Sequence, residues 1–311
     1  MDQKYAGISA GTGRPIAWVE SPLQFIAAAE WASARDERIA VAFRLTGPQM
    51  SRTAEELLNR GAPFATCAPY YGIPWQLLSE NREWAVGDAF SGQFRLAGAI
   101  TPPRKLTLLD DGAMTLAVAD ALVGSIPFGR PGQKESAVHR QLGTLVRDRM
   151  LGMAARERLD LFTGFALGHD RLGRLRDRGI RVSQHRLDWV RRTARPIAVP
   201  GNRVLLGSAL PVDGRMPLPN YLAWVAAEAR EAGLAYLPHR RETAATLAPV
   251  AAIPGVRVYN TGLPIELVLA GAREPLEVVT LPTSAETTLG WLLEGSGSVI
   301  RKRTLQLGAA R

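Results

Sequence analysis

The sequence is poor in cysteine and has no long apolar run. Cys67 is the only cysteine among the 311 residues. A single cysteine excludes an internal disulfide and a metal site built from cysteine pairs. No apolar run reaches the roughly 20 residues of a membrane-spanning helix, and no hydrophobic segment follows the first residues as in a secretory signal. We therefore expect a cytoplasmic protein that is stabilised by packing.

Several nucleotide and nucleic-acid motifs are also absent. Ser21-Pro22-Leu23-Gln24 follows the first predicted strand, where a nicotinamide oxidoreductase carries G-x-G-x-x-G. The chain has no C-x-x-C zinc spacing, no aromatic-glycine RNA-binding signature and no regular helix-turn-helix pattern. These absences disfavour an oxidoreductase and sequence-specific nucleic-acid recognition.

The charge is strongly positive and unevenly spread. The net charge is +9, and arginine is concentrated between Arg140 and Arg195. Such a segment is either a solvated helical face or a surface for an anionic partner. An acidic glycan, an anionic membrane surface and nucleic acid each remain compatible with the charge.

Apolar periodicity alternates between strands and helices along most of the chain. Strands followed by helices predict parallel sheets covered by helices. The pattern breaks at ARPIAVPGN, residues 194–202, and then restarts. We expect a first Rossmann-like domain at 1–196, which includes an arginine-rich helical segment, and a second at 197–311. The predicted strands cover residues 15–21, 38–45, 82–88, 105–109, 202–210, 235–239, 256–260 and 276–284.

Polar residues stand where these strands end, which is where open parallel sheets bind ligands. A carboxylate there can accept a proton, a histidine can act on a leaving phosphate, and a helix start with hydroxyls can bind an anion. Each group also has an ordinary structural explanation as a cap, a turn or a surface residue. The groups are Ser21, Asp88, Asp110 with Asp111, Gly207 with Ser208, His239, and Thr283 with Ser284.

Glu266 is unusual because it lies inside the apolar run LPIELVL. Burying a carboxylate is costly unless a partner compensates it. Either Glu266 faces solvent on its helix or it has such a partner.

Several of these motifs together resemble the bacterial sialyltransferases and polysialyltransferases. That family has an acidic-acidic-glycine motif, then a His-Pro motif, then a paired hydroxyl motif. The matching residues here are Asp110-Asp111-Gly112, YLPHRRE at 236–242, and Pro282-Thr283-Ser284, with WVESPLQ at 18–24 and VGDAFS at 86–91 as further similarities. Two departures are Arg240 where the family has proline after the histidine, and a Thr-Ser pair in place of Ser-Ser.

The resemblance implies the α/β GT-B fold, in which two Rossmann-like domains face each other across a cleft. It also implies roles for individual residues, while Asp111 would serve as a cap or as an orienting partner of Asp110. The implied roles are Asp110 as general base, His239 as acid or electrostatic partner of the donor phosphate, Thr283 and Ser284 as ligands of its oxygens, Glu266 as acceptor of the ribose hydroxyls, and Gly207 as the place where cytosine approaches.

The function expected from the resemblance is an inverting, metal-independent glycosyl transfer without a cofactor. A sialic acid or related nonulosonic acid would move from its CMP-activated donor to a glycan hydroxyl, as in capsule or lipooligosaccharide biosynthesis. The acceptor would be acidic or lipid-linked, with peripheral contact to the inner membrane surface. Two alternatives remain: transfer from another nucleotide sugar such as CMP-Kdo, and a non-catalytic basic protein that binds glycan or nucleic acid.

Overall fold

The computed structural model describes residues 13–304, and the chain divides into two compact units. Unit 1 is Met1–Thr193 and unit 2 is Ala194–Arg311. The sequence predicts the division at residue 196. Each unit is built around a parallel β-sheet with helices packed against it. The expected α/β class is therefore confirmed, while the GT-B arrangement of the two domains stays a prediction.

Unit 1 contains a seven-stranded parallel sheet with the strand order β3-β2-β1-β4-β5-β6-β7. The order reverses direction between β1 and β4, which is the topological switch point of a doubly wound sheet. Its elements are β1 (Ile16–Val19), α1 (Pro22–Ala34), β2 (Ile39–Arg44), α2 (Pro48–Asn59), β3 (Phe64–Tyr70), α3 (Trp75–Glu80), β4 (Glu83–Val86), α4 (Gly92–Ile100), β5 (Lys105–Leu108), α5 (Met114–Val123), α6 (Ala137–Ala154), β6 (Leu159–Thr163), α7 (Gly168–Asp177), β7 (Arg181–Gln184) and α8 (Asp188–Arg192).

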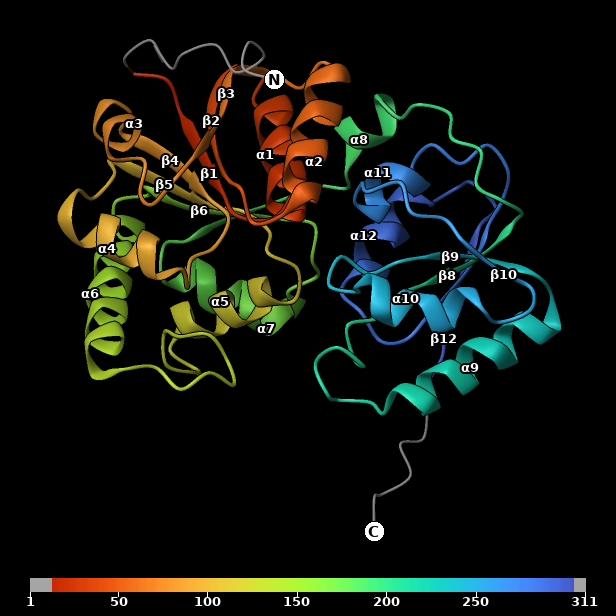
Figure 1. The fold of residues 1–311 in the computed structure, drawn as a ribbon. Coiled ribbons are helices and arrows are strands. Elements are labelled where there is room, and N and C mark those ends of the chain that lie inside the picture. The colour runs from red at the N-terminus through yellow and green to blue at the C-terminus, as the bar shows by residue number, and fades with distance from the viewer. Residues whose placement is uncertain (1–12, 305–311) are drawn as a thin grey trace. The chain divides into compact units, whose positions relative to one another are not determined.

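Both faces of this sheet are covered. Helices α1 and α2 lie on one side, where Phe25 of α1 packs on Phe43 and Phe64 of the sheet (Figure 1). Trp18 of β1 points to the other side and joins a core that includes Phe94 of α4. Burial on two faces explains why the central strands are continuous apolar runs.

The apolar pattern of the sequence does not predict three strands of unit 1. β3 is FATCAPY, an edge strand in which Pro69 interrupts the run. Proline is tolerated at a sheet edge because its missing N–H costs no ladder bond there. β6 and β7 lie inside the segment predicted to be helical, so that prediction was wrong for residues 159–163 and 181–184.

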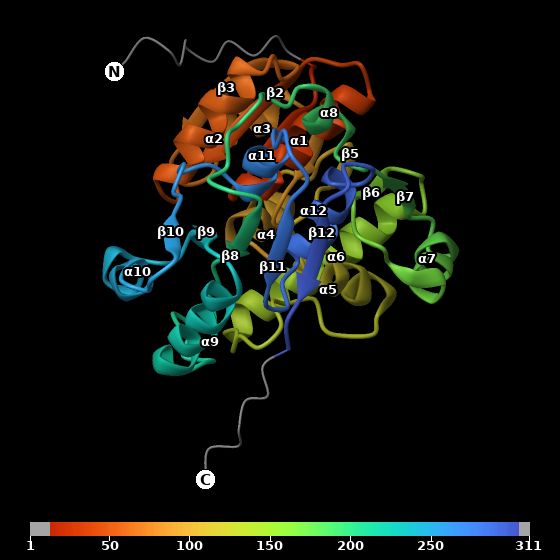
Figure 2. The ribbon, with the colours of Figure 1, turned by 90° about the vertical axis from the view of Figure 1, so that its right-hand side faces the viewer.

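Unit 2 contains a five-stranded parallel sheet with the order β10-β9-β8-β11-β12 (Figure 2). Parallel pairing joins every neighbouring pair of its strands. Its elements are β8 (Arg203–Leu206), α9 (Leu218–Glu231), β9 (Leu234–Leu237), α10 (Ala244–Ala251), β10 (Val256–Val258), α11 (Ile265–Leu269), β11 (Glu277–Thr280), α12 (Ala285–Leu292) and β12 (Val299–Lys302).

Candidate functional site

Polar side chains gather at the carboxyl edge of the unit 1 sheet. We call this group the carboxylate cluster. It follows the ends of four strands, β1, β4, β5 and β7, on both sides of the switch point. Its members are Gln24, Asp88, Asp110, Asp111 and His185.

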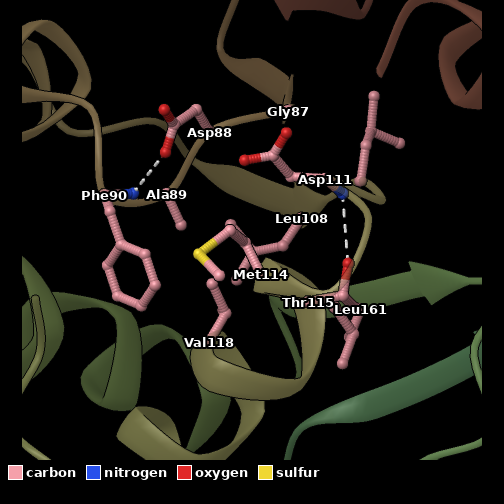
Figure 3. Close-up of a pocket in the computed structure, with 11 residues that line it drawn as sticks. Gly87, Asp88, Ala89, Phe90, Leu108, Asp111, Met114, Thr115, Val118 and Leu161 are labelled. Carbon is pink, nitrogen blue, oxygen red and sulfur yellow. Dashed lines mark hydrogen bonds between the residues drawn. The ribbon is translucent and has the colours of Figure 1, made fainter. Parts of the chain in front are cut away.

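Two members of the cluster, Asp88 and Asp111, line a pocket. Their neighbours there include Gly87 and Met114. Figure 3 shows the Asp111 and Asp88 side chains on the same side of Met114. One oxygen of Asp111, Oδ1, accepts a hydrogen bond of 2.7 Å from Nε2 of Gln24. The Asp111 side chain is half-buried.

Asp110 is buried, with 1% of its surface exposed. Its Oδ2 accepts from the Gly164 N–H at 2.7 Å and lies 2.9 Å from Nε2 of His185. Its Oδ1 accepts from the Thr115 hydroxyl at 3.2 Å. The same hydroxyl accepts the N–H of Asp111 at 3.1 Å, so one threonine ties both acidic residues to α5.

This placement surrounds the Asp110 carboxylate with protein groups. A general base has to come within hydrogen-bond distance of the proton that it takes from a substrate. Both carboxylate oxygens of Asp110 already accept hydrogen bonds inside the protein. Asp111 is the acidic residue of the pair that lines the pocket, and the role of Asp110 as general base stays a prediction.

The turn interpretation of the same triplet also holds. Gly112 has φ of 61°, in the left-handed region that favours glycine. The triplet therefore both turns the chain into α5 and presents a carboxylate to the pocket.

The start of α1 supports Asp111 from the other side of the switch point. Ser21 caps this helix by accepting the Gln24 N–H, and Gln24 in turn accepts the Glu20 N–H at 2.6 Å through Oε1. The Gln24 side chain fills the space beside Gly87, where a β-carbon would come within 2.3 Å of it. Gly87 therefore allows the close approach that holds Gln24 in place.

Asp88 is held by a loop between α5 and α6. Its carboxylate accepts the Phe90 N–H at 2.9 Å and forms an ion pair with Arg130 from that loop. The loop is anchored by Glu135, which binds the buried guanidinium of Arg95 through bonds of 2.9 and 3.0 Å. Sequence reasoning names Asp88 but neither of these arginines.

His185 is a member of this cluster that the sequence pattern does not single out. It follows β7, an exposed edge strand with no apolar run to mark it. Its only sequence signal is a position just after a β-strand, and that strand was not predicted. The ring is 7% exposed and stacks on Phe162 of β6 at 4.7 Å between centroids.

A second polar group lies at the carboxyl edge of the unit 2 sheet, around Glu242. Its Oε2 accepts the N–H of His239 at 2.6 Å, and its Oε1 accepts from the hydroxyl of Tyr236 at 2.6 Å. The Tyr236 and Tyr221 hydroxyls are 2.6 Å apart. Burial raises the pKa of Glu242 and of both tyrosines.

Gly207 allows the close packing of this network. A β-carbon there would lie 2.2 Å from Oε2 of Glu242 and 2.6 Å from the His239 nitrogen. The close approach that requires glycine is thus made by Glu242 of the same chain. The expected approach of cytosine at Gly207 stays a prediction.

His239 is half-buried, and its ring has a defined orientation. Its Nδ1 accepts the N–H of Arg241 at 3.2 Å, so the proton of the neutral ring is on Nε2. Burial, reinforced by the charges of Arg241 and Arg240, lowers its pKa to about 4. At neutral pH the side chain is an uncharged hydrogen-bond donor.

Glu266 has the partner that its position in an apolar run requires. It is 7% exposed on α11, and its Oε1 accepts from the hydroxyl of Thr288 on α12 at 2.9 Å. Burial raises its pKa, while Thr288 and the charge of Arg240 act in the opposite direction. The solvent-facing alternative is excluded for this residue.

Thr283 and Ser284 lead from β11 into α12, and Ser284 is the N-cap residue. The Thr283 hydroxyl accepts the Ala285 N–H at 3.4 Å. The Ser284 side chain makes no capping bond to the helix. The pair stands at the positive end of the helix dipole, where an anion would be stabilised.

Arginines of the basic segment bind within unit 1. Arg147 and Arg174 donate to carbonyls at the end of α5, at 3.0 and 3.3 Å, and Arg149 donates to the Gly98 carbonyl of α4 at 2.8 Å. The Arg171 guanidinium donates two hydrogen bonds to the Asp120 carboxylate, at 2.6 and 3.1 Å. Cations at helix C-termini complement the dipole, which favours a structural explanation for these four arginines.

Between residues 13 and 304, no three histidine, cysteine, aspartate or glutamate residues are grouped as a metal site requires. Over the same range, no helix combines the length and apolar character needed to cross a bilayer.

Comparisons with known proteins return structural similarities only. No family model matches the chain, and no curated protein matches it. It is similar to the solved structure titled "Spinosyn Rhamnosyltransferase SpnG", with 14% identity over 92% of this chain and 79% of that one, and a TM-score of 0.38. It is also similar to a glycotransferase of kitacinnamycin, with 16% identity, 94% and 86% coverage, and a TM-score of 0.36. Both TM-scores are low.

Proposed function

We propose that this protein is an inverting, metal-independent glycosyltransferase. It transfers a sialic acid or a related nonulosonic acid from a CMP-activated donor to a glycan hydroxyl. The observation that carries the proposal is the fixed Asp111 carboxylate at the end of β5, held by Gln24 beside a pocket. The donor type rests on the resemblance of three short motifs to the bacterial sialyltransferases.

Asp111 is the proposed proton acceptor. The acceptor oxygen attacks the anomeric carbon, and its proton passes to Asp111 as the new C–O bond forms. An ordinary aspartate, with a pKa near 4, is a weak base, but it has only to accept a proton that the attacking oxygen is already losing. Because Asp110 is adjacent, this transfer also removes one of two neighbouring negative charges.

His239 is the proposed partner of the leaving group. The bond between the anomeric carbon and the phosphate oxygen breaks, and CMP departs with an additional negative charge. A neutral imidazole with its proton on Nε2 can donate a hydrogen bond to that phosphate without giving up the proton. The low pKa of His239, about 4, favours this electrostatic role over that of a general acid.

Thr283, Ser284 and Glu266 complete the proposed donor site. The two hydroxyls and the start of α12 would bind phosphate oxygens. Glu266 would accept hydrogen bonds from ribose through Oε2, because Oε1 already binds Thr288.

The decisive experiment combines product analysis with two matched variants. The protein is incubated with CMP-activated nonulosonic acids and a panel of glycan acceptors, and products are read by mass spectrometry. Asp111→Asn should lower kcat by about two to four orders of magnitude. CMP binding should be unchanged, because Asp111 lies in the other unit from the proposed donor site. Asp170→Asn, at an aspartate with 86% of its side chain exposed, is the control.

The outcomes separate the alternatives. Full activity in Asp111→Asn would remove the assignment of the base. Transfer from CMP-Kdo alone would identify the alternative donor by the mass of the product. For the non-catalytic alternative, a thermal-shift screen with CMP, UDP, GDP and NAD should show no stabilisation, while binding to acidic polymers should weaken steeply with salt.

A further inference from the structure

We propose that His185 is a positioning residue for the Asp110-Asp111 pair. Its Nε2–H holds the buried Asp110 carboxylate, and this contact keeps the adjacent Asp111 carboxylate directed at the pocket. The inference rests on the proposed function, since it concerns the same proton transfer.

The environment of His185 leaves its ring little freedom. Its Nε2 lies 2.9 Å from Oδ2 of Asp110, which also accepts the Gly164 N–H at 2.7 Å. One ring face stacks on Phe162 at 4.7 Å, with 20° between the planes. Gly164 lies close by, and a β-carbon there would be 3.2 Å from Cε1 of the ring. The histidine and the Gly164 amide thus hold one oxygen of Asp110 together.

The hydrogen-bond pattern assigns the proton on this ring. The Nδ1 atom of His185 is buried, and among the described residues it has no hydrogen-bond partner. An N–H at Nδ1 would therefore be buried without an acceptor, which is unfavourable. The favoured tautomer carries its proton on Nε2 and donates it to Asp110.

The loop after His185 is tied to the helix that supports Asp111. Glu30 of α1 is 3% exposed, and it accepts the N–H groups of Trp189 and Val190 at 3.1 and 2.8 Å. Between them and His185 stands Leu187, whose φ of 59° is uncommon for a branched residue. Such a backbone persists only where its surroundings fix it.

These contacts form a closed ring of hydrogen bonds and chain segments. Helix α1 carries both Gln24, which binds Asp111, and Glu30, which anchors the His185 loop. His185 binds Asp110, and Asp110 is the chain neighbour of Asp111. Removing the imidazole opens the ring at Asp110, whose Oδ2 then keeps only the Gly164 amide. The Asp111 carboxylate should lose its alignment without any loss of donor binding.

Kinetics of three variants test this role. His185→Leu should lower kcat on the order of a hundredfold, since misplacement by about 1 Å costs that much, with an unchanged KM for the CMP donor. His185→Gln, whose amide can place a donor near the position of Nε2, should recover most of kcat. His169→Leu, at an exposed histidine of α7, should match the wild type. Thermal unfolding verifies that each variant is folded.

Two results would overturn the role: normal kcat in His185→Leu, or equal losses in the Leu and Gln variants. A spectroscopic measurement separates this inference from the proposed function. The chain has four histidines, so ¹⁵N-histidine NMR can assign each ring with single variants. An Nε2–H signal of His185 that shifts in Asp110→Asn supports the pair, even if the wild type transfers no sugar. A proton on Nδ1 would contradict it.

Discussion

A β-carbon on Gly207 would lie 2.2 Å from Oε2 of Glu242, so these residues fit together only because Gly207 has no side chain. Gly207→Ala should displace Glu242 and with it the backbone of His239. We expect unit 2 to lose about 1–3 kcal/mol of stability, as in other overpacked sites. CMP affinity should fall as well. Urea unfolding and CMP titration measure the two effects.

Gly290 offers the matched control for that substitution. It lies within α12, and its β-carbon would meet no atom within 4 Å. Gly290→Ala should therefore stabilise the protein by about 0.5–1 kcal/mol through helix propensity. Equal effects at the two glycines would refute the proposed crowding at Gly207.

Two substitutions of Glu242, by alanine and by glutamine, should lower CMP affinity to different extents. Glu242→Ala leaves the His239 N–H and the Tyr236 hydroxyl without their acceptor, so CMP binding should weaken about tenfold or more. Glu242→Gln keeps one acceptor for His239, and its amide can donate to Tyr236 if that hydroxyl turns toward Tyr221. Isothermal titration should rank the affinities wild type, Gln, Ala. An alanine variant that binds CMP normally would show that the network has no part in donor binding.

The pKa of His239 predicts how stability changes with pH. Burial and the charges of Arg241 and Arg240 lower this pKa from 6.5 to about 4. Between these values the unfolded chain binds a proton that the folded chain does not, so the free energy of unfolding decreases as the pH falls. His239→Gln should remove this contribution. The measurement is the difference between wild type and variant in urea unfolding from pH 7 to pH 4.

The wild type has to be compared with His239→Gln because other groups titrate in the same pH range. Burial raises the pKa of Glu30, Glu242 and Glu266, which lowers stability as the pH rises, opposite to His239. His169→Gln, at an exposed histidine, serves as control. A difference between wild type and His239→Gln that stays constant with pH would contradict the lowered pKa.

The Arg95–Glu135 pair predicts a large loss of stability. The Arg95 side chain is 1% exposed and binds Glu135 through two nitrogens. Glu135→Ala would leave a buried guanidinium without its counter-charge, which should cost about 3 kcal/mol or more. Arg181→Ala breaks a pair whose arginine is 53% exposed and should cost less than about 1 kcal/mol. Chemical denaturation of both variants gives the comparison, and similar costs would contradict it.

The predictability of the fold follows the burial of its strands. β1, β4 and β5 are buried over most of their length and follow the sequence pattern closely. β7, RVSQ, is exposed along most of its length at the sheet edge, so it carries no hydrophobic signal. Its strand character comes from pairing with β6, a long-range contact that local periodicity cannot predict.

The sequence predicts where the acidic residues of the candidate site lie in the fold, but not which way their side chains point. The sequence places two adjacent carboxylates after β5, yet it cannot tell which one points inward. That choice depends on the Gly164 amide and His185, which follow strands that the pattern does not mark. For Glu266 the sequence left two alternatives, and the Thr288 hydroxyl decides between them.

The Gln24 side chain occupies the space that a side chain at position 87 would need. A β-carbon on Gly87 would lie 2.3 Å from the carboxamide oxygen of Gln24. Neither residue can therefore change size independently of the other. Among related sequences, a larger residue at the position of Gly87 should occur together with a shorter one at the position of Gln24. A chain altered at both positions would lose the amide that binds Asp111, so this pair of positions would distinguish relatives that can hold the proposed base from those that cannot.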